Sequence, residues 1–159
     1  MRMHDIPDVL AVQAESYAPH MNEEESVVRR RFEAAPDTAW VVESAGAVTA
    51  YLVAYPSLLG QITPLAGSFT LPNQADCLYL HDLAVMRRNR GTGAATRLVE
   101  RAFAFMRAQG LRHSALVAVQ DSRHFWENLG YRPSEALSPA QENLLASYRT
   151  MAAYMTCCR

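Results

Sequence analysis

The segment from Tyr79 to Val99 places two glycines and several arginines between an apolar run and a helical pattern, a combination that can bind a phosphate ester. Gly91 and Gly93 lack a Cβ atom, so a bulky ligand can come close to the main chain. The amides from Gly91 to Thr96 would point outward together, and the helix dipole adds positive potential there. Four arginines are close enough to add charge-assisted hydrogen bonds: Arg87, Arg88, Arg90 and Arg97. The alternative is a solvated basic turn.

Two common phosphate-binding motifs are excluded at this turn. The lysine and the hydroxyl residue of G-x-x-x-x-G-K-[ST] are missing. Thr96 occupies the place of the third glycine in the dinucleotide motif G-x-G-x-x-G. The ligand is therefore predicted to be neither a P-loop triphosphate nor a Rossmann-bound dinucleotide.

The elements that must position this turn follow from hydrophobic periodicity and turn residues. Helices are predicted at about Ile6–Tyr17, Glu23–Ala34, from the glycines to Gln109, at Ser122–Gly130 and at Pro139–Tyr148. Strands are predicted as a hairpin over residues 38–56 with its turn at Ala45-Gly46, then at Cys77–Val85, Ser114–Val119 and about Arg149–Thr156. The strand–helix–strand order from Leu78 to Val119 implies one parallel pair with a right-handed crossover. An α/β fold with a mixed sheet and helices on both faces is expected.

The composition is that of an ordinary globular chain. The 159 residues suit a single domain over 1–159, half of them are hydrophobic, and the formal net charge is −1. That charge gives no support to nucleic-acid binding, and no signal peptide or membrane span is apparent. The three cysteines, Cys77, Cys157 and Cys158, form neither a disulfide framework nor a zinc spacing, so a reducing, cytoplasmic setting without a metal is expected.

The stretch "LAV" ends at Val85, Arg90 follows five residues later, and the stretch "RGTGAA" begins at Arg90. This stretch resembles the acetyl-CoA motif Q/R-x-x-G-x-G/A of the GNAT superfamily of N-acetyltransferases, with Arg90, Gly93 and Ala95 at its fixed places. The later stretch "QDSRHFWENLGYRP" resembles the family's second motif, an aromatic helix ending in Leu-Gly-Phe/Tyr. The resemblance covers nearly the whole chain. It implies a mostly antiparallel sheet with one parallel strand pair, although only the few residues before Ile6 are available for the family's first strand.

The resemblance also implies how acetyl-CoA would bind as a cosubstrate. The main chain of Leu83 to Val85 would pair with the pantetheine arm like an added strand, and the amides after Gly91 would hold the pyrophosphate. Arg87 or Arg88 would reach the ribose phosphate, and the region of Asp121 and Ser122 would contact the coenzyme tail. The residues expected to bind the coenzyme are Leu83, Ala84, Val85, Arg90, Gly91, Thr92, Gly93, Ala94, Ala95, Thr96 and Ser122.

His81 is the expected catalytic base. An alkylammonium with a pKa near 10 must lose a proton before it attacks, at a cost of about 4 kcal/mol at pH 7. An imidazole suits that task, and His81 shares a strand face with Tyr79, Leu83 and Val85, whereas Asp82 faces the other way unless a bulge turns it. The stretch "YLHDLAV" also resembles the arylalkylamine N-acetyltransferases, which carry H-x-H here, with Tyr79 in place of the first histidine. The alternative is a structural histidine. The Val85 N–H would stabilise the oxyanion.

One departure from the family concerns the acid that protonates the leaving thiolate. Many members have a tyrosine where this chain has Trp126, and an indole cannot release a proton at useful pH. Tyr79, Tyr131 and Ser122 are candidate acids, and the alternative is protonation by water. Trp126 is then expected to pack in the core or beside the coenzyme.

The acceptor is expected to be a small primary amine. The long loop Pro56–Asp76 has many apolar residues and few charges, which favours an apolar or aromatic amine if the loop borders the amine pocket rather than only covering the sheet edge. The alternatives are an N-terminal or lysine amine of a protein, or a non-catalytic acyl-CoA-binding module. The chain is expected to act as a monomer or homodimer, with neither nucleic acid nor membrane as a partner.

Overall fold

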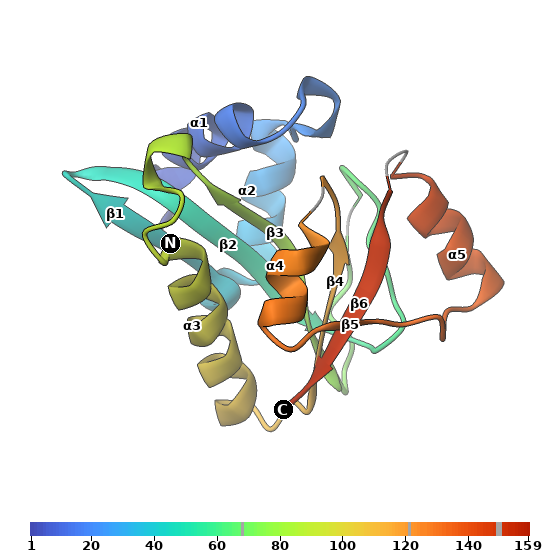
Figure 1. The fold of residues 1–159 in the computed structure, drawn as a ribbon. Coiled ribbons are helices and arrows are strands. Elements are labelled where there is room, and N and C mark those ends of the chain that lie inside the picture. Colours follow the sequence, from blue (N-terminus) through green and yellow to red (C-terminus); the bar gives the residue numbers. More distant parts are fainter. Residues whose placement is uncertain (68, 121, 149–150) are drawn as a thin grey trace. The chain divides into compact units, whose positions relative to one another are not determined.

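The computed structural model describes residues 1–67, 69–120, 122–148 and 151–159. Its helices are α1 (Ile6–Ser16), α2 (Glu25–Ala34), α3 (Ala94–Ala108), α4 (Arg123–Asn128) and α5 (Pro139–Ala146). Its strands are β1 (Ala39–Ser44), β2 (Ala47–Ser57), β3 (Cys77–Val85), β4 (His113–Ala118), β5 (Arg132–Pro133) and β6 (Ala153–Cys158). The strands form one mixed sheet in the order β1-β2-β3-β4-β6-β5, and Figure 1 shows these elements along the chain.

The expected fold class is confirmed. Cys77–Tyr79 of β3 pairs in parallel with His113–Ala115 of β4, and the strand pairs β1·β2, β4·β6 and β5·β6 are antiparallel. The predicted hairpin turn is also confirmed, because Ala45 and Gly46 both have positive φ, at 51° and 78°. Two consecutive residues of this kind match the right-handed twist of the strands that they join.

The chain divides into two compact units, here called unit 1 (residues 1–54 and 82–105) and unit 2 (residues 55–81 and 106–159). Unit 1 has helices on both faces of its part of the sheet (Figure 1). On one face α1 and α2 pack against the strands, because Ile6, Val9, Val12 and Val28 share a core with Tyr51 and Val53. On the opposite face Trp40 of β1 meets Phe105 of α3 edge to face, with ring centroids 6.0 Å apart.

Unit 2 is built around β4, which β6 flanks along its whole length from Ala153 to Cys158. Its core includes Leu78, Leu116, Tyr131 and Met155, none more than 1% exposed. The segment between β2 and β3 is held at several points, since the Gly60 N–H donates to Tyr154 Oη at 2.8 Å. The Ile62 N–H donates to Gln141 Oε1 at 2.7 Å, which fixes the loop to α5.

Three expectations about elements need correction. The last strand is β6, which begins at Ala153 rather than at about Arg149; Arg149 and Thr150 lie outside the described residues, and Met151 is 90% exposed. The burial of Tyr154, Met155 and Cys157 against β4 decides this register. Sequence reasoning missed β5, because two residues carry no detectable periodicity. The residues before Ile6 form a 3-10 turn at Met3–Asp5 and hold no strand.

Among the described residues no helix is both long and apolar enough to cross a membrane. The three cysteines are all free thiols, with Cys77 and Cys157 buried and Cys158 exposed. Burial raises the pKa of Cys77 to about 12, so its thiol stays protonated at neutral pH.

Candidate functional site

The turn between β3 and α3 in unit 1 is open at the two glycines. Gly91 and Gly93 have φ values of 77° and 80°, the left-handed region that side chains rarely adopt. A Cβ atom built on Gly91 would meet nothing within 4 Å, and one on Gly93 would meet only Arg97 Nη1, at 3.5 Å. The main chain is therefore accessible to a ligand on this side.

Contacts within the turn hold it in this shape. The Thr92 hydroxyl donates to the Asn89 carbonyl at 2.7 Å, and Arg97 Nη1 donates to the Thr92 carbonyl at 3.0 Å. From Arg90 to Gly93 every residue is exposed, while Ala94 is buried at the start of α3. The first amides of a helix have no partners inside the helix, so this end of α3 offers hydrogen-bond donors to an anion. Ala95 and Thr96, also expected to bind the coenzyme, are half-buried in that first turn.

The arginines beside the turn are exposed. Arg87 and Arg88 lie in a 3-10 turn that follows β3, and Arg90 and Arg97 flank the glycines. Together they give unit 1 a cationic surface beside the first amides of α3, which is the electrostatic environment that a pyrophosphate requires.

The main-chain groups of the three β3 residues that were expected to pair with pantetheine point to different edges of the strand. The Met86 N–H donates to the Thr49 carbonyl of β2 at 2.9 Å. Main-chain groups alternate along a strand, so those of Ala84 also point toward β2, and those of Leu83 and Val85 point to the other edge. A ligand that adds to that edge would therefore meet Leu83 and Val85 but not the main chain of Ala84.

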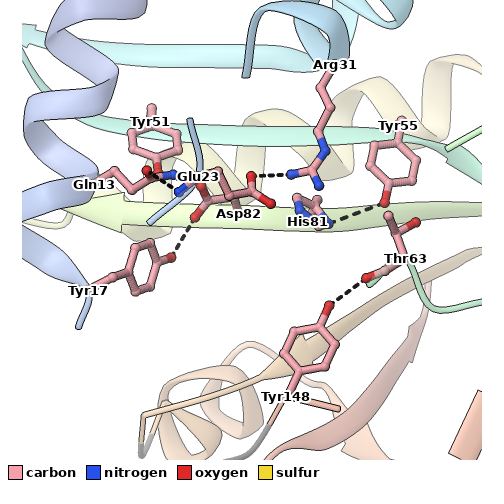
Figure 2. A network of polar contacts seen from close by, with 10 residues as sticks. All are labelled: Gln13, Tyr17, Glu23, Arg31, Tyr51, Tyr55, Thr63, His81, Asp82 and Tyr148. Carbon is pink, nitrogen blue, oxygen red and sulfur yellow. Dashed lines mark hydrogen bonds and ion pairs between the residues drawn. The ribbon is translucent and has the colours of Figure 1, made fainter. Parts of the chain in front are cut away.

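His81 lies in unit 2 among aromatic rings (Figure 2). Its Nδ1 is 3.3 Å from Tyr55 Oη, and its ring centroid is 6.1 Å from that of Tyr79. Phe69, from the long loop, stacks on Tyr55 with centroids 3.7 Å apart and an angle of 8°. The imidazole is half-buried, and it therefore combines contact with solvent and an apolar aromatic surrounding.

The Tyr148 hydroxyl donates to the Thr63 carbonyl at 2.6 Å (Figure 2). Tyr148 is also a hydrogen-bonding neighbour of the buried Tyr79 hydroxyl. Burial raises the pKa of Tyr79 well above its ordinary value, and the neighbouring Tyr148 adds to that rise. Loss of a proton from this phenol is therefore unfavourable, although Tyr79 does lie next to His81 as the sequence predicts.

Tyr131 lies in a different part of unit 2, in its core. Its ring is fully buried, its hydroxyl is 2.6 Å from Ser114 Oγ, and Ser114 donates to the Leu78 carbonyl at 3.1 Å. Burial raises the pKa of Tyr131, and the bond to Ser114 only partly opposes that shift. Trp126 packs edge to face against Tyr131 with centroids 5.3 Å apart and is 6% exposed, which fits the expected packing role.

Ser122 precedes α4 and is half-buried, and Asp121 lies outside the described residues. Among the described residues no group of three or more His, Cys, Asp or Glu side chains could hold a metal ion.

Asp82 is at the centre of a polar network in unit 1 that sequence reasoning missed (Figure 2). Tyr17 Oη and Tyr51 Oη donate to its two carboxylate oxygens, at 2.6 Å and 2.5 Å. Gln13 contacts Tyr51 and accepts from the Glu23 N–H at 2.8 Å. The consecutive residues His81 and Asp82 contact two tyrosines of β2 that are four positions apart, Tyr55 and Tyr51. No sequence signal indicates this network, because its members come from α1, β2 and β3.

Buried Arg31 and Glu23 form an ion pair beside this network, with exposed side-chain fractions of 4% and 7%. Burial and the Asp82 carboxylate raise the pKa of both Tyr17 and Tyr51 well above the ordinary value of a phenol. The two phenols thus remain neutral donors to Asp82 at all ordinary pH values.

Comparisons with known proteins identify the family and the fold. Residues 6–131 match the acetyltransferase (GNAT) family. The GphF GNAT-like decarboxylase in complex with isobutyryl-CoA has a similar structure, with a TM-score of 0.82, 16% identity, and coverage of 99% of this chain and 96% of that one. Ard1 from Thermoplasma volcanium gives 0.74 at 15% identity, with coverage of 99% and 93%.

A third similar structure is the ribosomal-protein-S18-alanine N-acetyltransferase from Escherichia coli, with a TM-score of 0.67, 12% identity, and coverage of 99% and 90%. No curated protein matches the chain. Identities of this size establish a common fold and no common substrate.

Proposed function

The chain belongs to the acetyltransferase (GNAT) family, and we propose that it transfers an acetyl group from acetyl-CoA to the primary amine of a small, apolar or aromatic acceptor. The single observation that carries the proposal is the open glycine turn at the start of α3. There, exposed arginines are close in sequence to Gly91 and Gly93, whose main chain no Cβ atom shields. This arrangement fits a pyrophosphate, and we assign Arg90 to Thr96 to its binding.

In the proposed reaction His81 takes the proton that the ammonium must lose, and the amine nitrogen then attacks the thioester carbonyl. The C–N bond forms as the carbonyl oxygen gains charge, and the Val85 N–H donates to that oxygen. The C–S bond then breaks, the nitrogen gives up its second proton to water, and the CoA thiolate leaves. Because the candidate hydroxyls of Tyr79 and Tyr131 are buried with raised pKa values, we assign the protonation of the thiolate to water. A thiolate whose acid has a pKa of about 8.5 needs little assistance.

The aromatic surroundings of His81 support the choice of acceptor. Tyr55 and Tyr79 are no more than 2% exposed, and Phe69 stacks on the first of them. Apolar rings favour an apolar or aromatic acceptor and give no anionic partner to a polycation. We further propose that the chain works as one domain in the reducing cytoplasm, where its three thiols stay free.

The proposal is tested by mixing the chain with acetyl-CoA and a panel of amines, and measuring both free thiol and acetylated product. The panel contains arylalkylamines, a polyamine, and peptides with a free N-terminus or a lysine. Acetylated arylalkylamine supports the proposal, and acetylated peptide would redirect it to a protein acetyltransferase. Coenzyme binding without turnover would indicate an acyl-CoA-binding module. Carbon dioxide from a carboxyacyl-CoA would indicate the reaction named for the GphF protein.

Gly93→Glu is expected to abolish coenzyme binding, because it places bulk and negative charge where the pyrophosphate is assigned. Calorimetric titration with CoA measures the effect. Gly46→Glu is the matched control, since Gly46 also has an open environment and a φ of 78° but lies in the hairpin turn. Micromolar binding by Gly93→Glu would contradict the assignment of the turn.

A further inference from the structure

Three consecutive residues at the end of α1 contact the edge of β3 that faces away from β2. The Arg87 N–H, just after β3, donates to Glu15 Oε1 at 2.6 Å. Ser16 Oγ donates to the Val85 carbonyl at 3.2 Å. Both contacts lie within unit 1. They reach Val85 and Arg87, which are two residues apart.

Tyr17 contacts Leu83, which lies two residues before Val85 on β3. Its Oη lies 2.9 Å from the Leu83 carbonyl and 2.6 Å from Asp82 Oδ1. A phenol has one hydrogen, so that hydrogen is shared between the carboxylate and the carbonyl. Tyr51 Oη donates to the other oxygen of Asp82, at 2.5 Å. The carboxylate that accepts from Tyr17 is therefore itself held by a second phenol.

The side chains of residues 15, 16 and 17 therefore contact the main chain of residues 87, 85 and 83 in order. Positions two apart on a strand point to the same edge and are separated by about 6.8 Å. This is the edge on which Leu83 and Val85 are assigned to the pantetheine arm. The carbonyls at this edge are already contacted by α1, while the Val85 N–H takes part in none of these contacts.

We propose that Ser16 and Tyr17 are positioning residues for the coenzyme, with Asp82 and Tyr51 holding Tyr17 in place. This inference rests on the proposed function and names residues that the glycine turn does not involve. By fixing the carbonyls of Val85 and Leu83, the end of α1 sets the orientation of both peptide groups. The Val85 N–H belongs to the Ala84–Val85 peptide group that lies between these two, so it is held from both sides and can donate to the carbonyl oxygen of a bound thioester without a rearrangement.

The test compares Tyr17→Phe and Ser16→Ala with Tyr154→Phe, a matched control. Tyr154 is 2% exposed, and its hydroxyl accepts from the Gly60 N–H in unit 2, so its loss also removes one hydrogen bond. Three quantities are measured for each variant. They are the Kd of CoA by calorimetry, the KM for acetyl-CoA against kcat, and the exchange rates of the Leu83 and Val85 amides in the free protein.

Tyr17→Phe is expected to raise both Kd and KM about tenfold, as for one lost hydrogen bond, and to lower kcat as well, because the Val85 N–H is also assigned to the oxyanion. Ser16→Ala is expected to raise them about threefold, because its bond is longer. Exchange at Leu83 and Val85 should become several times faster in Tyr17→Phe. The control should change each quantity by less than about twofold.

Unchanged Kd and unchanged amide exchange in Tyr17→Phe would overturn the inference and leave the proposed function standing. An equal rise of KM in Tyr17→Phe and Tyr154→Phe would also overturn it, because that would be a general loss of stability. If the wild-type chain binds no CoA at all, the proposed function is wrong and the coenzyme role of Ser16 and Tyr17 is lost with it.

Discussion

The two neighbours His81 and Asp82 belong to regions of contrasting chemistry. Asp82, in unit 1, has a phenol on each carboxylate oxygen at 2.6 Å and 2.5 Å. His81, in unit 2, has a phenol oxygen at 3.3 Å and otherwise lies among aromatic rings. The short charge-assisted bonds fix Asp82, whereas the contact of His81 with the phenol is longer. The contrast supports a structural role for Asp82 and the proposed catalytic role for His81.

The largest expected effect that tests this contrast is on stability. Asp82→Ala removes the carboxylate that accepts from both Tyr17 and Tyr51, and the loss of two charge-assisted hydrogen bonds costs about 2–4 kcal/mol of unfolding free energy. Urea denaturation measures the loss. Asp37→Ala, at an exposed carboxylate, is the control and should change stability by less than about 0.5 kcal/mol. A similarly small change in Asp82→Ala would remove the structural half of the comparison.

His81→Ala is the opposite case, with an effect on rate. Turnover should fall at least tenfold, as expected for a lost general base, while the unfolding free energy and the affinity for CoA change little. The pH–rate profile of the variant should differ from that of the wild type. An unchanged profile would return His81 to a structural role, and a large loss of stability would make it resemble Asp82.

The smallest expected effect concerns the alkaline limb of stability. Burial and the Asp82 carboxylate raise the pKa of Tyr51 above its unfolded value, so unfolding releases a proton once the pH exceeds about 10. The stabilisation is complete below that pH and falls as the pH rises toward the folded pKa, by up to about 1.4 kcal/mol per pH unit. Tyr51→Phe should therefore show a flatter decline of stability above pH 10 in denaturation experiments. A slope equal to that of the wild type would mean that Tyr51 titrates alike in both states.

The regions also differ in how far the sequence predicts them. The glycine turn, the face of His81 and the parallel strand pair follow from residues near one another in the chain. The polar contacts around β3 do not follow from the local sequence, since Tyr17 donates to Asp82 across 65 positions and Tyr148 donates to the Thr63 carbonyl across 85. The stacking of Phe69 on Tyr55 could not be predicted either, because Tyr55 is part of an apolar strand and Phe69 of a loop without periodicity. Tyr79 and Tyr131, grouped as candidate acids by residue type, occupy separate surroundings.

Sequence alone determined the order of the elements apart from β5, the open turn before α3 and the strand that carries His81, because periodicity, glycine and alternation act over a few residues. Only the tertiary structure decided that the end of α1 follows the edge of β3, and that two phenols share Asp82. Such contacts depend on which side chains, far apart in the sequence, the packing brings within about 3 Å of one another. No local sequence pattern indicates which ones these are.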